Sequence, residues 1–272
     1  MEYGLKRFED LFFTDDFLFS KIMRDPEIAR GVVESLLGFK VKKIEFLTSQ
    51  HTVEALFGGR GVRLDAYLEE SGRVIDIEMQ TVLRADEGLR MRYYQGMIDV
   101  EHLSRGESYR NMKESYIIFI CLDDPFGDDK PVYSFVTKEE DGDFILNDRI
   151  HKVIYNASSY EKAENPAVYA FLKFLKERRA SDELTSKIQA RVETCTKFNK
   201  WESDYMLWRD QVREWQDDAR EAGFAEGEKR GKEEKALETA RNMLKCNISA
   251  EIIAECTGLS MAEISALKET KA

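Results

Sequence analysis

Three carboxylates within one short stretch could bind a metal ion: Asp65, Asp76 and Glu78. Carboxylates that lie side by side repel one another, so grouping them is costly unless a positive charge sits between them. Hard divalent cations such as Mg²⁺ take oxygen ligands, usually one or two carboxylates together with waters and substrate phosphates. If the three side chains share a face, they predict a site for Mg²⁺ or Mn²⁺.

The elements around these acids predict such a shared face. Residues 61–70 and 73–81 each alternate apolar and polar side chains, with Ser71-Gly72 between them, a pattern that predicts a β-hairpin. A two-residue turn sets Asp65 opposite Glu78, with Cβ atoms about 4.5–5.5 Å apart on one face. The same register gives three further opposed pairs: Glu70 with Arg73, Tyr67 with Asp76, and Arg63 with Gln80.

Two other readings of this hairpin stay open. It could be an ordinary amphipathic hairpin whose polar face lies in water. A turn one residue longer would set Asp65 opposite Ile77 and separate the acids. We keep the two-residue turn because it aligns the apolar faces as well as the acids.

The same residues resemble a known family. Asp65, followed after the turn by Glu78-Met79-Gln80, resembles the active-site hairpin of the PD-(D/E)XK nuclease superfamily, in which an Asp and an acid-x-Lys share a metal site. RLDAYLEESGRVIDIEMQT, followed by RMRYYQGMID at 90–99, resembles more narrowly the Rpn family of recombination-promoting nucleases and transposases. The likeness extends from LFFTDDFLFSKIM to MLKCNISAEIIAECTGLSMAEI, so it covers most of the chain.

This resemblance implies a metal-dependent DNA endonuclease that hydrolyses phosphodiester bonds, with DNA as its partner and Mg²⁺ or Mn²⁺ as its cofactor. It implies Asp65 and Glu78 as metal ligands, Asp76 as their neighbour or an outer ligand, and Gln80 as the third catalytic residue. Gln80 stands where the wider superfamily has Lys. An amide can orient water and donate hydrogen bonds but adds no charge, so we expect slower or more metal-dependent cleavage.

Two other classes of function remain open. The chain could be a catalytically degenerate protein of the nuclease fold that binds DNA or a protein. It could also be an assembly protein that works through its helical tail.

Residues 86–104 predict a helix directly after the hairpin. Its expected core stripe is Leu89, Tyr93, Met97, Val100 and Leu103. A second stripe, which either faces water or borders the site, carries Arg92, Gln95, Asp99 and His102. Because of the family's RYYQ motif, the resemblance implies Arg92, Tyr94 and Gln95 as substrate-binding residues.

Glu34 is a further acid that could join the predicted metal site. Asp25-Pro26 predicts the start of a helix that Gly38 ends. Some nucleases of this superfamily add an acid from their first helix to the metal site, and Glu34 lies on this helix. Because Glu34 lies off the apolar stripe, we expect it to be solvated.

The remaining pattern predicts an α/β fold: a mixed central β-sheet flanked by helices, the restriction-endonuclease-like core, with an α-helical C-terminal extension. Besides the hairpin, the expected strands are Val41–Leu47, Ser115–Leu122, Val132–Thr137 and Lys152–Tyr155. The expected domains are a nuclease core at 1–165, a helical region at 166–222 that packs on or extends the core, and a tail at 223–272.

The tail is either a helix or a linker over 223–235, where Gly223, Gly227 and Gly231 recur four apart. Two short helices follow, the second beginning with a Ser260-x-x-Glu263 capping box. Their surface is acidic, which favours a hairpin of two packed helices over a helix that recognises DNA bases. The aromatic face Trp201–Trp215 favours core packing or a homodimer through the helical region.

Composition sets wider limits. The 272 residues are 43% hydrophobic and 34% charged, with a formal net charge of −11. This acidic balance counts against bulk coating of nucleic acid but is compatible with a nuclease, whose metal site is itself acidic. The four cysteines form no C-x-x-C pair, so we expect no zinc ribbon and a cytoplasmic, reducing location. The longest apolar run, Tyr116–Leu122, is far below the roughly 20 residues of a membrane helix, and we expect no membrane partner.

Overall fold

The computed structural model describes residues 6–53, 61–82 and 84–269. These residues divide into two compact units, of which the larger ends at Tyr205 and the smaller begins at Met206. The division falls inside one long helix, α6 (Asn199–Lys245), and inside the helical region that the sequence predicts over 166–222.

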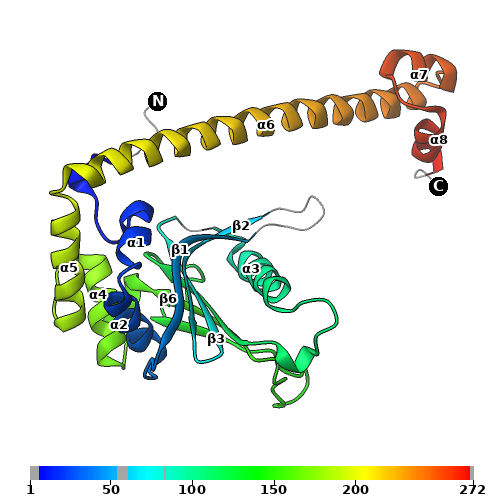
Figure 1. Ribbon diagram of the computed structural model, residues 1–272. Helices are drawn as coiled ribbons and strands as arrows, with labels where there is room; N and C mark the ends of the chain where they lie inside the picture. The colour runs from blue at the N-terminus through cyan, green and yellow to red at the C-terminus, as the bar shows by residue number, and fades with distance from the viewer. Residues whose placement is uncertain (1–5, 54–60, 83, 270–272) are drawn as a thin grey trace. The chain divides into compact units, whose positions relative to one another are not determined.

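The larger unit is built on a six-stranded sheet with the order β1-β2-β3-β4-β6-β5 (Figure 1). Its strands are β1 (Ile44–Val53), β2 (Val62–Glu70), β3 (Arg73–Gln80), β4 (Glu114–Cys121), β5 (Val132–Phe135) and β6 (Ile150–Asn156). β1, β2 and β3 are antiparallel, β3, β4 and β6 are parallel, and β5 is antiparallel to β6. The mixed sheet with flanking helices confirms the predicted α/β fold class.

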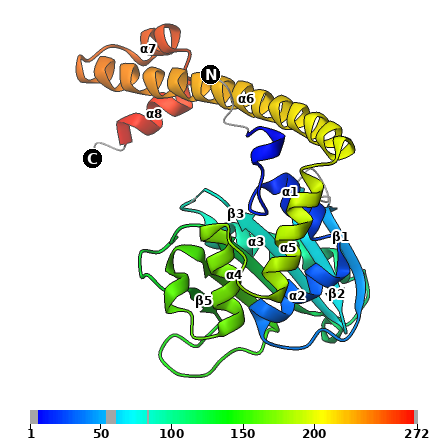
Figure 2. The same ribbon diagram turned by 90° about the vertical axis from the view of Figure 1, so that its left-hand side faces the viewer.

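Helices cover both faces of this sheet (Figures 1 and 2). One face carries α3 (Glu87–His102). The other carries α1 (Asp16–Ile22), α2 (Pro26–Leu37), α4 (Pro166–Glu177) and α5 (Glu183–Cys195). Short 3-10 helices lie at Phe8–Asp10, Tyr109–Asn111 and Ala157–Lys162. The predicted start and stop of α2 are confirmed, since Asp25 accepts hydrogen bonds from the first turn and Gly38 ends the helix at φ 74°.

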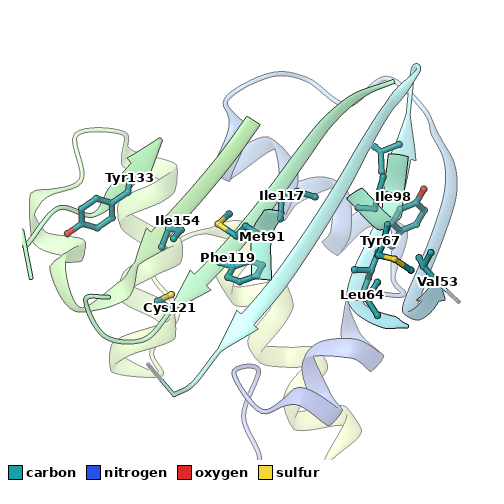
Figure 3. Packing of buried hydrophobic residues seen from close by; sticks show 13 residues of the cluster. Val53, Leu64, Tyr67, Met91, Ile98, Ile117, Phe119, Cys121, Tyr133 and Ile154 are labelled. Atoms are coloured by element: carbon teal, nitrogen blue, oxygen red, sulfur yellow. The ribbon is translucent and has the colours of Figure 1, made fainter. Parts of the chain in front are cut away.

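Apolar side chains fill the layer between α3 and the sheet (Figure 3). Met91 packs beside Phe119 of β4, and Leu64 and Tyr67 of β2 pack with Ile98. On the opposite face, Phe13 has its ring 5.2 Å from Phe19 and 6.3 Å from both Phe171 and Phe174. The central strands of the sheet are therefore buried on both sides, where polar groups need hydrogen-bond partners.

The turn between β2 and β3 fixes the register of the hairpin. Ser71 and Gly72 both have positive φ, at 48° and 82°, as a two-residue hairpin turn of type I′ requires. The backbone pairs run from Glu70–Arg73 to Ala66–Ile77 and include Tyr67–Asp76. The predicted two-residue turn is confirmed, and the alternative with a longer turn is wrong.

The smaller unit contains the rest of α6 with α7 (Ala250–Thr257) and α8 (Met261–Glu269). Ala240, Ile253 and Ile264 form its buried centre. Residues 223–235 are helical, and the capping box is confirmed by hydrogen bonds in both directions between Ser260 and Glu263. In the part of the chain that the structure describes, no helix is both long and apolar enough to cross a membrane.

Candidate active site

Asp65 and Glu78 meet where β2 and β3 separate. The ladder between these strands stops at Ala66–Ile77, one step short of the expected Asp65–Glu78 pair. Beyond that point, Asp65 N donates to Glu78 Oε1 at 2.8 Å, and Met79 N donates to Asp65 Oδ2 at 3.3 Å. Each carboxylate thus accepts an N–H of the opposite strand, which holds the two acids side by side at this strand fork.

Arg63 and Gln80 separate beyond the fork. Arg63 pairs with Thr52 of β1, and Gln80 pairs with Cys121 of β4. The expected pair Arg63–Gln80 is therefore replaced by pairings on either side of the fork.

The side chains of β3 continue the site away from the fork. Asp76, Glu78 and Gln80 lie on one side of the pleat and are 0%, 3% and 8% exposed. Their neighbours on β4 are Ile117, Phe119 and Cys121, so the acids stand against an apolar wall. Both carboxylate oxygens of Asp76 are buried without a hydrogen-bond partner, an arrangement that disfavours its ionised form.

The electrostatics of the cluster follow from this burial. Burial raises the pKa of Asp76 well above its ordinary value, and the charge of Asp65 raises it further. Burial also raises the pKa of Glu78, with a further increase from Asp76. The pKa of Asp65 is raised by burial, then by Glu78 and by Asp16. The carboxylates therefore repel one another, and water screens this repulsion least at Asp76 and Glu78, which are buried.

Asp16, the first residue of α1, is an acid of this cluster that the sequence did not identify. Its Oδ1 is buried without a hydrogen-bond partner, and its Oδ2 lies 3.7 Å from Arg63 Nη2. Burial raises the pKa of Asp16, with Arg63 opposing. Glu34, the helix acid considered from the sequence, instead bonds Lys40 Nζ at 2.7 Å and Val41 N at 3.0 Å.

Arg90 of α3 brings a second cation to the site besides Arg63, and the sequence did not identify it as a site residue. Its Nη1 donates to Gln80 Oε1 at 2.7 Å and to Glu87 Oε2 at 2.9 Å. Its Nη2 donates to Tyr94 Oη at 3.2 Å and lies 3.9 Å from Glu78 Oε2. The guanidinium is also 5.1 Å from the ring centroid of Phe119, so hydrogen bonds and a ring contact together fix its position.

The other residues predicted on this helix have different places. Tyr94 contacts the site through Arg90, and Arg92 is exposed. Gln95 is buried, where its amide donates to Asp99 Oδ1 and accepts from Ser115 Oγ. The structure therefore brings Asp65, Asp76, Glu78 and Gln80 together with Tyr94 at their edge, and leaves Arg92 and Gln95 outside.

The predicted core stripe of this helix is wrong at three positions. Leu89, Tyr93 and Val100 are 60%, 40% and 57% exposed. The buried side instead carries Glu87, Met91, Gln95, Met97 and Ile98. The physical reason is that α3 covers a sheet face that bears acids, so its inward side must supply polar partners as well as apolar contacts.

The donor set of the cluster fits a hard divalent cation. It offers carboxylate oxygens from three elements, and both oxygens of Asp76 and the Oδ1 of Asp16 are buried without a hydrogen-bond partner. Such oxygens and their mutual repulsion are relieved by a Mg²⁺-like ion. Within residues 6–53, 61–82 and 84–269, no three His, Cys, Asp or Glu side chains are already arranged around one metal position.

We expect Asp76→Asn to flatten the pH dependence of stability in EDTA. An unfolded Asp loses its proton near pH 4, whereas folded Asp76 holds its proton to higher pH. The folded state then binds more protons, so stability falls as pH rises through that window. Urea unfolding over a pH series measures this slope.

Glu34→Gln is the control of opposite sign. Burial acts to raise the pKa of Glu34, but hydrogen bonds from Lys40 and Val41 outweigh it and the pKa is lowered. Its contribution is present above the ordinary pKa and lost as pH falls, so this variant should lose stability only toward neutral pH. Equal slopes for wild type and Asp76→Asn would contradict the account of Asp76.

Comparison with known proteins gives the family of the chain. No curated protein and no solved structure matches the chain. The sequence model of one family matches residues 10–221, which include α1, the strand fork, α3 and the whole sheet. The chain belongs to this family, described as PD-(D/E)XK nuclease family transposase.

Proposed function

We propose that the chain is a divalent-metal-dependent DNA endonuclease that hydrolyses phosphodiester bonds in transposase-associated recombination. The observation that carries this proposal is the strand fork, where Asp65 and Glu78 are held side by side next to the buried Asp76. Family membership supports a nuclease. Nicking of supercoiled DNA with Mg²⁺ or Mn²⁺ tests it, with Asp65→Ala as the inactive variant.

In this proposal Asp65 and Glu78 hold the metal ion, and Asp76 adds negative charge beside them. Each ligand uses one oxygen for its backbone bond, which leaves Asp65 Oδ1 and Glu78 Oε2 outside those bonds. When bound, Mg²⁺ or Mn²⁺ would neutralise charge on the scissile phosphate and lower the pKa of water. The buried acids give the ion its site, and the apolar wall of β4 limits competing water.

Gln80 and Arg90 together replace the lysine of the wider superfamily. Because Arg90 occupies the carbonyl oxygen of Gln80, the NH₂ of that amide is the end that can donate to a water. The positive charge that Gln80 lacks comes from Arg90, near Glu78. Tyr94 and Glu87 hold Arg90 in place, so we assign Arg90 as a positioning residue.

We expect Gln80→Ala to reduce DNA cleavage about 10²-fold, as loss of one preorganised donor does. Mn²⁺ affinity should change little, since the amide orients water and does not hold the metal. Initial rates on a labelled duplex and Mn²⁺ titration by calorimetry measure the two effects separately.

Gln211→Ala removes the same amide from an exposed position and is the control for the loss of a glutamine. Wild-type cleavage by Gln80→Ala would show that Gln80 is only a polar residue of the sheet face.

A further inference from the structure

A cavity of about 480 Å³ lies in the larger unit at the end of α1. It is lined from α1, from the start of α2, from α5 and from the first residues of α6. Four of its side chains are cationic: Lys21, Arg24, Arg191 and Lys200. A basic cavity is unexpected in a chain of net charge −11, and none of these residues takes part in the site described above.

The two carboxylates that also line the cavity are already engaged. Asp25 caps α2 and accepts from Glu27 N at 3.0 Å and from Ile28 N at 3.5 Å. Asp204 pairs with Lys21 at 3.0 Å. Arg191 and Lys200 are both exposed, so the cavity keeps an excess of positive charge that suits an anionic ligand.

An aromatic side chain lies among these cations. Trp201 lines the cavity, and Lys21 Nζ is 5.2 Å from the centroid of its ring. Basic side chains beside an aromatic ring are the combination with which proteins bind single-stranded nucleic acid, since phosphates meet the cations and bases stack on rings. A free phosphate ion would use the cations but gain nothing from the indole.

The cavity is connected to the acid cluster through α1. This helix begins with Asp16 of the cluster and carries Lys21 of the cavity five residues later. At 1.5 Å per residue the two positions are about 7.5 Å apart along the helix axis. Each strand of a DNA duplex advances about 3.4 Å per nucleotide, so at this stacked spacing the separation corresponds to about two nucleotides.

We propose that this cavity binds the backbone of a single-stranded segment of DNA that flanks the cleavage site, with Arg191 and Lys200 on phosphates and Trp201 against a base. The choice of DNA as the anion rests on the proposed function. The contact would place the strand relative to the acids and would supply local attraction to a protein whose overall charge repels nucleic acid.

The test is DNA binding by the full-length chain in EDTA, where cleavage cannot occur. The probe is a short fluorescein-labelled single-stranded oligonucleotide, and fluorescence anisotropy gives its affinity over a series of salt concentrations. In Arg191→Gln/Lys200→Gln the slope of log K against log [salt] should become shallower by about 1.4, since each phosphate contact on a single strand contributes about 0.7.

Arg105→Gln/Lys138→Gln is the matched control. Both residues are exposed in the larger unit and lie outside the cavity, so this variant loses the same charge and should keep the wild-type slope. A slope unchanged in the cavity variant, or shallower by the same amount in the control, overturns the proposal. Addition of inorganic phosphate to the wild type should compete only weakly; full competition at low concentration would mark a phosphate site and also overturn it.

Failure here and failure of the proposed function give different results. If the wild type nicks DNA with Mn²⁺ but the cavity variant keeps the wild-type salt slope, the proposed nuclease function stands and the proposed cavity contact is wrong. If the wild type never nicks DNA but the salt slope is shallower only in the cavity variant, the proposed DNA contact stands and the proposed nuclease function is wrong.

Discussion

We expect Asp65→Asn and Glu78→Gln each to lower metal-dependent DNA cleavage by at least about 100-fold, because a metal ion contributes several kcal/mol of transition-state stabilisation. Mn²⁺ binding should be lost with it, since each variant removes one of two proposed ligands. The fold should persist, because the amide oxygen of either variant can still accept the backbone N–H that the carboxylate accepts now. Calorimetric Mn²⁺ titration, cleavage rates and thermal unfolding in EDTA measure the three outcomes.

Glu34→Gln is the control for these variants, because Glu34 is a partly buried acid that bonds Lys40 away from the fork. It should bind Mn²⁺ and cut DNA as the wild type does. Wild-type cleavage by either fork variant would remove Asp65 or Glu78 from the proposed site.

Arg90→Gln should have the second largest effect. It removes the cation from Glu78 and from Glu87, which are both 3% exposed, and breaking a buried pair in this way costs about 3–5 kcal/mol of stability. Arg90 also lowers the pKa of Glu78 against the effects of burial and Asp76. Without it, Glu78 ionises only at higher pH, so the acidic limb of the pH–rate profile should move to higher pH.

Two other variants separate position from charge. Arg90→Lys keeps the positive charge but loses the paired N–H donors that bond Gln80 and Glu87. Its pH–rate profile should therefore lie close to that of the wild type, while its cleavage rate stays reduced. Arg92→Gln, two residues along on the exposed side of α3, removes an equal charge without touching Gln80. If Arg92→Gln moves the acidic limb as far as Arg90→Gln does, Arg90 has no special place in the site.

The hairpin could be predicted because its information is local. Alternation over two runs and the Ser71-Gly72 turn were enough to give the register, and the pairs Tyr67–Asp76 and Glu70–Arg73 are confirmed. What the hairpin alone could not give is the point where its strands part. That point depends on the pairing of β2 with β1 and of β3 with β4 beyond the fork. The hairpin sequence itself contains no information about either pairing.

Arg90 and Asp16 could not be assigned to the site from the sequence for a different reason. The spacing of apolar residues predicts that Leu89 and Tyr93 face the core, which places Arg90 away from the site. A helix that covers buried acids needs polar side chains on its inward face, so apolar spacing does not predict which face is buried. Asp16 lies 49 positions before Asp65 (65 minus 16), and no periodic pattern connects a helix start to a strand. Self-association through the aromatic face of the helical region stays a prediction from the sequence.

Nicking of supercoiled plasmid DNA by the purified full-length chain tests the central claim most directly. The assay compares wild type with Asp65→Ala, each in Mg²⁺, in Mn²⁺ and in EDTA, at equal protein concentration. The account predicts conversion of supercoiled to nicked DNA by the wild type with either metal ion, no conversion in EDTA, and none by Asp65→Ala under any condition. Nicking that persists in EDTA, or that Asp65→Ala carries out at the wild-type rate, would contradict it, as would a wild type that binds Mn²⁺ at the strand fork and leaves the DNA intact.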